Sequence, residues 1–224
     1  MVGWMHYLGR GTVRDEQKGV KIIRDTKSDE FKLGEDECLA GYNHADSNSP
    51  TSCKFIQLCQ LGSNRDWLCR QLMAVCFFNG FGTTNDRKKA AGLFEQLAND
   101  GHSVSQYWIG LCFWSGGGVS EDNDKAFKWF SKSADQGNSY GQVMVGVCHY
   151  HGYAATRDYT KAAEWYRKSA ERGNRYGQED LGQCYRYGRG VPKNIDTAVF
   201  WYQESADQGN REAIDKLTQL GKWP

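Results

Sequence analysis

The sequence predicts an all-α fold, a right-handed α-solenoid superhelix of 36-residue helix–turn–helix repeats. The period is visible first in four cysteines, Cys76, Cys112, Cys148 and Cys184. The same interval separates two glycine columns, Gly80, Gly116, Gly152 and Gly188, and Gly101, Gly137, Gly173 and Gly209. An aromatic column (Phe94, Phe130, Tyr166 and Tyr202) and an alanine column (Ala90, Ala126, Ala162 and Ala198) keep the same register. Self-similarity at a period of this length is the signature of a stacked repeat array.

The first helix of each repeat carries the cysteine. Around Cys184, the neighbouring Leu181, Gly182 and Tyr185 recur at helical spacing, with Gly177 one turn earlier. Small residues on this face let a partner helix approach closely. Gly188 stands where a left-handed C-cap is expected, so the helix should end there.

The second helix of each repeat begins at a column of N-cap residues, whose side-chain oxygens accept from free amides of the first turn. The column is Asp86, Asp122, Asp158 and Asn194. Ala162, Tyr166 and Ala170 are expected on the inner side of one such helix, which Gly173 terminates. Three tryptophans beside the aromatic column are expected to pack in the core, namely Trp129, Trp165 and Trp201.

The repeats predict a single array over residues 1–224. Its expected divisions are a truncated repeat (1–29), a degenerate repeat (30–65), four regular repeats (66–101, 102–137, 138–173 and 174–209) and a closing helix with a tail (210–224). In the degenerate repeat, Gly34, Cys38, Leu39 and Tyr42 are placed on the first helix, and the second helix begins near Pro50. The first repeat lacks the opening turns of its first helix. This predicts a fragment of a longer array, with further repeats of a parent chain as neighbours.

Composition excludes several classes of function. The net charge is +1 and no basic cluster is present, which argues against binding to nucleic acid or to an anionic membrane. No apolar run approaches the ~18 residues that a membrane span needs. The N-terminal residues form neither a basic leader nor an apolar stretch, so a secretory signal is not expected.

The repeat motif is similar to a known family. Leu181, Gly182, Cys184, Tyr185, Gly188, Gly190 and Val191, followed by Ala198, Trp201, Tyr202, Asp207, Gly209 and Asn210, resemble the Sel-one-like repeat, a relative of the tetratricopeptide repeat. The resemblance is strong over residues 66–209 and weaker over 1–65, and the cysteine column is similar to a fungal variant of the family. It implies an adaptor that assembles protein complexes. One departure is Tyr153-Ala154-Ala155, which stands where a second glycine is usual.

The cysteine column is interpreted as small thiols buried in a helix interface. Helices of neighbouring repeats pack ~8–10 Å apart, beyond the ~7 Å limit for joining two Cα atoms by a disulfide. Thiols kept in this way indicate a reducing compartment, and a cytoplasmic location is expected. A disulfide between two of Cys38, Cys53 and Cys59 remains an alternative. No metal site, cofactor site or catalytic set is predicted, because no pair of histidines and no nucleophile motif has the spacing such sites require.

The remaining candidate is a protein-binding surface along the first helices. In related superhelices these helices line the concave side, and the predicted partner-binding stripe consists of Val75, Phe78, Tyr107, Leu111, Trp114, Tyr140, Val147, Tyr150, Gln183 and Arg186. Its aromatic and arginine side chains are typical of interface hot spots. A second interpretation stays open, in which superhelical curvature buries these rings against neighbouring first helices.

The function predicted from the sequence is therefore a scaffold or adaptor, not an enzyme, that binds a partner protein or peptide on its concave face. One alternative is a structural spacer within a larger signalling protein that contains a kinase domain. Another is a secreted, cysteine-rich repeat hydrolase, which would require a catalytic set that the sequence does not display.

Overall fold

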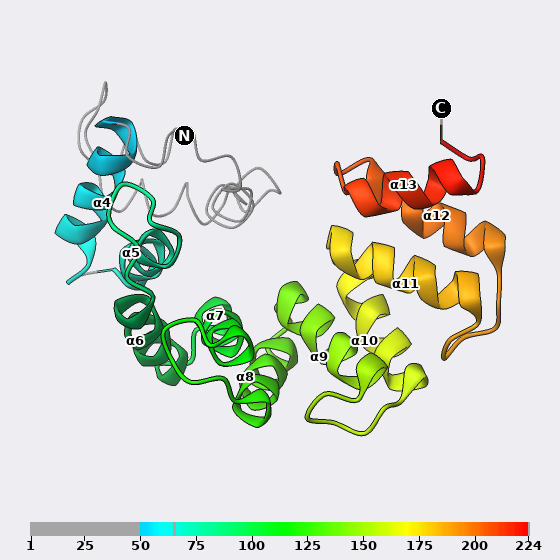
Figure 1. Cartoon of the computed structure of the whole chain (residues 1–224), viewed down its shortest axis with the longest axis horizontal. Coiled ribbons are helices and arrows are strands. Elements are labelled where there is room, and N and C mark those ends of the chain that lie inside the picture. The colour runs from blue at the N-terminus through cyan, green and yellow to red at the C-terminus, as the bar shows by residue number, and fades with distance from the viewer. Residues whose placement is uncertain (1–49, 65, 224) are drawn as a thin grey trace. The chain divides into compact units, whose positions relative to one another are not determined.

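The computed structural model describes residues 50–64 and 66–223, and within these ranges it is all α-helical. The helices follow one another in chain order (Figure 1). They are α4 (Pro50–Gly62), α5 (Trp67–Asn79), α6 (Arg87–Asn99), α7 (Ser103–Ser115), α8 (Asn123–Asp135), α9 (Ser139–His151), α10 (Tyr159–Glu171), α11 (Arg175–Tyr187), α12 (Ile195–Ala206) and α13 (Arg211–Gln219). The chain divides into two compact parts, Met1–Asn85 and Asp86–Pro224, which are described separately.

In the N-terminal part, α4 packs against α5. The start of α4 at Pro50 confirms the helix predicted there, since proline is favoured in the first turn. Asp66 caps α5, because its side chain accepts from the Leu68 amide at 2.9 Å. The predicted first helix through Gly34, Cys38 and Tyr42 lies outside the described residues, as does the truncated repeat 1–29.

The C-terminal part contains α6 to α13, and its helix ends confirm the predicted caps. Asp122 and Asp158 accept from the amides of Lys125 and Lys161, three residues ahead, as Asn194 does from the Thr197 amide. At the other end, α7, α9 and α11 each stop at a glycine in the left-handed conformation, which costs glycine no Cβ clash. The closing helix α13 confirms the helix predicted near the C-terminus.

Within a repeat, the two helices meet where a glycine faces an aromatic ring. A Cβ atom at Gly110, Gly146 or Gly182 would lie only 2.6–2.7 Å from the ring of Phe130, Tyr166 or Tyr202 respectively. All three rings are buried. Glycine in the first helix therefore allows the ring of the second helix to lie directly on its backbone, which confirms the predicted close approach.

Buried hydroxyl groups also join the two helices within each repeat. The Oγ atoms of Ser133, Ser169 and Ser205 donate to the carbonyl oxygens of Ser103, Ser139 and Arg175, each 30 residues earlier, at 2.7, 2.8 and 2.6 Å. These serines come from the second helix of one repeat, and their acceptors start the first helix of the same repeat. Each bond links the end of the second helix to the first turn of the first helix, and it gives the buried serine hydroxyl an acceptor.

The cysteine column is buried, as predicted. Cys112, Cys148 and Cys184 are free thiols with no exposed surface, and burial raises the pKa of each to about 12. A thiol with so high a pKa is held in its neutral, unreactive form at physiological pH. Cys38 lies outside the described residues, so the bridge left open in the sequence analysis stays a prediction.

Two of the three tryptophans beside the aromatic column differ from the prediction, whereas Trp201 is partly buried and packs against the core. Trp129 and Trp165 are only half-buried, and the ammonium groups of Lys132 and Lys168 lie 4.2 and 3.9 Å from their ring centroids. Their placement in the core was wrong. A residue next to the aromatic column is turned about 100° around the helix, so it reaches only the edge of the interface.

Candidate functional site

The predicted partner-binding stripe falls on both parts of the chain. Val75 and Phe78 lie on α5 of the N-terminal part, where Val75 is buried and Phe78 is half-buried. The remaining eight residues lie on α7, α9 and α11. Helix α11 packs against α9, and Tyr107 of α7 contacts Tyr140 of α9, so these three first helices form a wall. Its outer surface, with Leu111, Trp114, Val147, Tyr150, Gln183 and Arg186, is called here the first-helix face.

Two members of the stripe are buried in the wall itself. Tyr107 and Tyr140 keep only 8% and 9% of their surface exposed. Their ring centroids are 5.6 Å apart, and the Tyr176 ring lies 6.2 Å from that of Tyr140, so tyrosines form a row across α7, α9 and α11. For Tyr107 and Tyr140 the alternative given in the sequence analysis is correct. Superhelical curvature buries these rings against the neighbouring first helices, and the rings contact one another. They support the face and offer little surface to a ligand.

The rings of Trp114 and Tyr150 are half-buried, and each is covered in part by the loop of the next repeat. Tyr153 meets Trp114 edge-on, with ring centroids 5.3 Å apart. In the equivalent place 36 residues later, Arg189 donates to the Tyr150 hydroxyl, and its guanidinium lies 5.3 Å from that ring centroid. Sequence reasoning missed both covering residues, although each directly follows a C-cap glycine.

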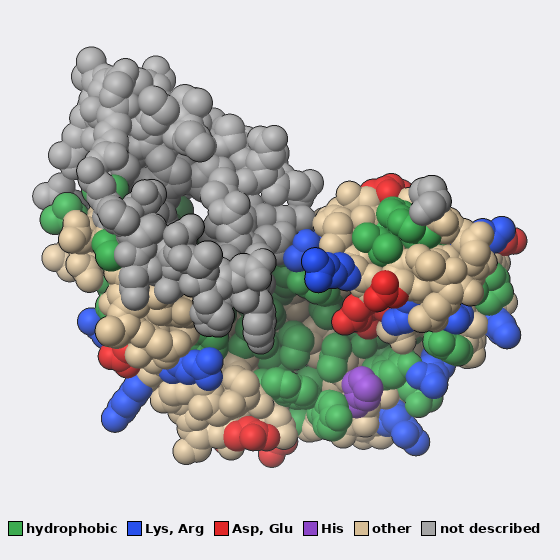
Figure 2. Space-filling view, turned by 45° about the horizontal axis from the view of Figure 1, so that its top comes forward, with side chains coloured by type: hydrophobic (Ala, Val, Ile, Leu, Met, Phe, Trp, Pro, Cys, Tyr) green, Lys and Arg blue, Asp and Glu red, His purple; other side chains and the backbone are tan. Residues whose placement is uncertain are grey.

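Figure 2 shows hydrophobic side chains gathered in a hollow of the C-terminal part, with acidic and basic side chains beside them. The apolar residues Leu111 and Val147 are half-buried on the first-helix face. Further along it, Gln183 donates to Glu179 Oε1 at 2.7 Å, and the same carboxylate oxygen accepts from Lys216 Nζ at 3.0 Å. The face therefore changes from apolar on α7 and α9 to charged on α11 and α13.

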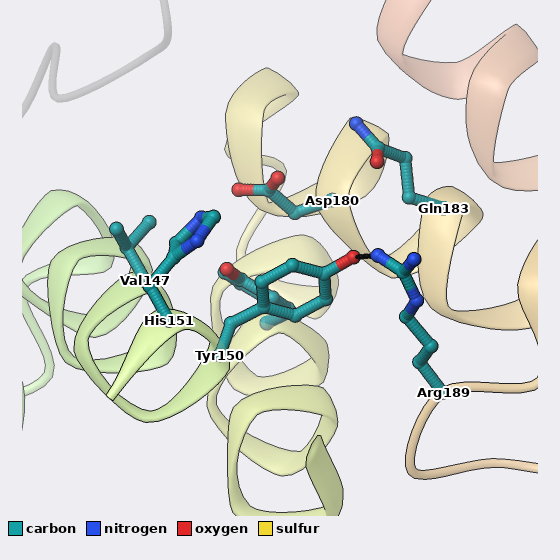
Figure 3. A pocket seen from close by; sticks show the side chains of 7 residues that line it. Val147, Tyr150, His151, Asp180, Gln183 and Arg189 are labelled. Atoms are coloured by element: carbon teal, nitrogen blue, oxygen red, sulfur yellow. Dashed lines mark hydrogen bonds between the residues drawn. The ribbon is translucent and has the colours of Figure 1, made fainter. Parts of the chain in front are cut away.

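A pocket of about 340 Å³ lies where the first-helix face changes from apolar to charged. From α9 it is lined by Val147, Tyr150 and His151, and from α11 by Asp180 and Gln183. Tyr166 of α10 and Arg189 of the following loop complete it. In Figure 3 the carboxylate of Asp180 points toward the side occupied by His151, whereas Arg189 is held at the Tyr150 hydroxyl on the other side.

Asp180 differs electrostatically from its neighbour Glu179. No hydrogen bond or ion pair to Asp180 is found among the described residues, whereas Glu179 has both Lys216 and Gln183. Burial raises the pKa of Asp180 well above its ordinary value, and the nearby carboxylates of Glu179 and Glu212 raise it further. Lys216 acts in the opposite direction but does not compensate. Asp180 is thus a carboxyl group whose ionised form has no hydrogen-bond or ion-pair partner in residues 50–64 and 66–223.

Other kinds of site are not found in the part of the chain that the structure describes. No three His, Cys, Asp or Glu side chains are grouped closely enough to bind a metal ion. Among the same residues, none of the helices combines the length and the apolar character that crossing a bilayer demands. Asp180, which sequence reasoning did not select, is an additional residue that the structure brings to the face.

The fold defines an all-α helical repeat protein, and part of its first-helix face is accessible to solvent. The Sel1 repeat model matches residues 1–22, 69–102, 103–138, 139–174 and 175–210. These segments make up well over half of the chain, which belongs to the Sel1 repeat family. Proteins with such repeats generally mediate protein–protein interactions.

Solved structures agree with the fold. A Sel1 repeat protein from Oxalobacter formigenes superposes with a TM-score of 0.70 at 19% identity, over 98% of this chain and 73% of that one. A protective antigen of uropathogenic Escherichia coli that displays an SLR fold gives a TM-score of 0.66 at 25% identity, over 98% of this chain. This chain spans 47% of that antigen, about half its length. An immunity protein of Pseudomonas aeruginosa gives 0.58 at 18% identity, over 86% and 72% of the two chains. No curated protein sequence matches the chain.

Proposed function

We propose that this protein is a scaffold that binds a segment of a partner protein on the first-helix face of its C-terminal part. The observation that carries the proposal is the half-exposed apolar surface of Leu111, Trp114, Val147 and Tyr150. Monomeric proteins seldom leave aromatic and aliphatic side chains grouped in a hollow unless a ligand covers them.

The wall beneath this surface supports binding for a second reason. The Tyr107, Tyr140 and Tyr176 rings contact one another, and Tyr153 and Arg189 hold the outer rings in place. Such side chains are already ordered before a ligand arrives. Binding then costs little conformational entropy, and a moderate contact area suffices for specific recognition. A cytoplasmic location, consistent with the buried neutral thiols, belongs to the same proposal.

The test is selection from a display library of short random peptides on the purified full chain. Selected peptides are then measured against two variants of equal charge change, Leu111→Arg on the first-helix face and Phe200→Arg on α12. Phe200 is 53% exposed on a second helix, so it reports on binding elsewhere on the molecule. We expect Leu111→Arg to weaken binding at least tenfold and Phe200→Arg to leave it unchanged.

Unchanged helicity by circular dichroism is required of both variants. If the selected peptides lose affinity for Phe200→Arg instead, the second-helix side is the ligand surface and the proposal is wrong. If the library yields no binder, the role of a structural spacer is favoured.

A further inference from the structure

The pocket around Asp180 has apolar counterparts in the preceding repeat. Thirty-six residues before Val147, Tyr150, Tyr166, Asp180 and Arg189 stand Leu111, Trp114, Phe130, Met144 and Tyr153. At the position of Asp180 itself, the earlier repeats have Trp108, which is buried, and Met144, which is half-buried. Repeats of one array ordinarily place side chains of one kind at such a position, so the carboxyl group departs from the packing rule that its own neighbours follow.

This departure is costly in the absence of a ligand. A carboxylate in a confined site loses hydration, and Asp180 recovers none of it through a hydrogen bond or ion pair to the described residues. The neighbouring Glu179 and Glu212 add repulsion, and Lys216 is already bound to Glu179. A positive charge brought into the pocket would relieve both penalties at once.

The other walls suit the remainder of a basic side chain. Val147 supplies an apolar surface for the methylene groups of a lysine or arginine stem. Tyr150 and Tyr166 supply aromatic rings, which attract cations at their faces. Arg189 does not neutralise Asp180, because it is held at the Tyr150 hydroxyl and lies over the rings of Tyr150, Tyr159 and Tyr187. Its position shows that a guanidinium is accommodated among these tyrosines.

The size of the pocket sets the size of the occupant. A volume of about 340 Å³ lies at the lower end of the range for small-ligand sites, enough for one long side chain but not for a helix. The apolar counterpart one repeat earlier lies ~8–10 Å away, the usual spacing of packed helices. An extended peptide covers that distance in about three residues.

We infer that the pocket around Asp180 receives a lysine or arginine side chain of the bound partner segment, about three residues from an apolar side chain that lies against Leu111 and Val147. This inference rests on the proposed function and specifies the chemistry of its ligand. The apolar residue provides contact area, and the basic residue fixes the register of the segment on the face.

The experiment uses acetylated synthetic peptides with a glycine–serine background that carry one leucine and one lysine three positions apart. Each is measured on the full chain beside a matched peptide with glutamine in place of lysine. The protein variants are Asp180→Asn and, as control, Asp135→Asn, which removes the same charge from an exposed position on α8. Asp180 is half-buried, and Asp180→Asn removes the cost of an ionised carboxyl in this confined site, so the variant is expected to fold.

We expect the lysine peptide to bind wild type at least tenfold more tightly than the glutamine peptide. Asp180→Asn should abolish this preference, and Asp135→Asn should preserve it. The losses of affinity caused by glutamine in the peptide and by Asp180→Asn in the protein should not be additive, because both changes remove the same contact. A cation beside Asp180 also lowers the pKa of this carboxyl, so the preference for lysine should strengthen as the pH rises through the range in which Asp180 ionises.

Three results would overturn the inference. If the peptides bind without a preference for lysine, while Leu111→Arg still weakens them, the scaffold proposal stands and the assignment of the pocket fails. If N-acetyl-lysine methylamide alone binds as tightly as the peptide, the pocket is a site for small cations. If no peptide binds wild type, including those from the random library, the proposed function itself is wrong.

Discussion

The Tyr166 ring lies against the backbone of Gly146, so closely that a Cβ atom on Gly146 would stand 2.6 Å from a ring carbon. The ring is buried, and Tyr166 is one of the residues that line the pocket around Asp180. Burial and the charge of Asp180 raise the pKa of Tyr166, which keeps the phenol neutral. One contact between α9 and α10 therefore positions both the core of the repeat and a wall of the candidate site.

Substituting Gly146 by alanine should destabilise the protein. The added methyl group must displace the Tyr166 ring or the backbone of α9, and overpacking of this kind costs about 1–3 kcal/mol. The matched control is Gly92→Ala on α6, where no atom lies within 4 Å of the new Cβ. There the better helix propensity of alanine should raise the free energy of unfolding by about 0.5–1 kcal/mol. Urea denaturation measures the free energy of unfolding of both variants. If alanine stabilises the protein at both positions, the close packing of Tyr166 on Gly146 does not limit the size of the residue there.

A second prediction concerns a hydrogen bond between two glutamine side chains. It occurs in repeats 102–137 and 174–209 and is missing from the repeat between them. Gln136 Nε2 donates to Gln106 Oε1, and Gln208 Nε2 donates to Gln178 Oε1, both at 2.7 Å. The equivalent donor position in the intervening repeat is Arg172, and Gln142 Oε1 is buried there without a partner. The arginine side chain instead extends beside Gly137.

Arg172→Gln should therefore raise the free energy of unfolding by about 1 kcal/mol, the usual gain from satisfying a buried acceptor. Arg172→Met is the matched control, because it removes the charge but supplies no donor. Thermal or urea unfolding of the two variants gives the answer. Equal stability of the glutamine and methionine variants would show that the oxygen of Gln142 is satisfied in another way.

Much of the fold could be predicted because it depends on local chemistry repeated at a constant interval. The N-cap at Asp158, the C-cap at Gly188 and the glycine that admits the Tyr166 ring are each recognisable within a few residues or one helix pair. The burial of Tyr107 and Tyr140 was not decidable from the sequence, since it depends on how sharply successive repeats turn.

The candidate site was harder to predict than the fold, because its contacts join residues of different repeats. Tyr153 and Arg189 cover rings that precede them by 39 residues, more than one period, so no single repeat contains the contact. Asp180 could have been noticed, because aspartate interrupts a column of apolar residues, Leu72, Trp108 and Met144. Its lack of a partner, however, depends on where Lys216 and Gln183 point, and only the structure shows that both bind Glu179.

The loop after α9 provides a third prediction. Ala154 has a φ of 51°, in the left-handed region, where the other repeats have Gly82, Gly118 and Gly190 with φ of 67–88°. A Cβ atom at Gly118 or Gly190 would overlap the carbonyl of Arg87 or Tyr159. Alanine in this conformation costs about 1 kcal/mol relative to glycine.

Ala154→Gly should therefore stabilise the protein by up to about 1 kcal/mol. The adjacent Ala155→Gly is the control, because its φ is not in the left-handed region and glycine there only adds freedom to the unfolded chain, at a cost of about 0.4–1 kcal/mol. Denaturation midpoints compared at unchanged m-value decide between the two effects. A loss of stability in both variants would mean that the Ala154 methyl group makes contacts that outweigh its strain.

The last prediction concerns the pH dependence of stability. The pKa of Asp180 is raised in the folded state by burial, Glu179 and Glu212, so folding favours the protonated carboxyl. His151, Tyr166 and Arg189 also line the pocket, whereas the charge that lowers the pKa of Asp180 is that of Lys216 on α13. A raised folded-state pKa contributes stability that is complete below the unfolded value of about 4 and is lost as the pH rises through the folded value.

Asp180→Asn should remove this slope. Near pH 4 the variant and wild type should unfold at similar urea concentrations, because a protonated carboxyl and an amide are both neutral. Toward neutral pH the variant should become progressively more stable than wild type. Asp135→Asn, which removes an exposed charge, should show a difference that does not grow with pH. A variant that is less stable than wild type at neutral pH would mean that ionised Asp180 stabilises the fold, and the pocket would then have no unmet charge for a basic ligand to satisfy.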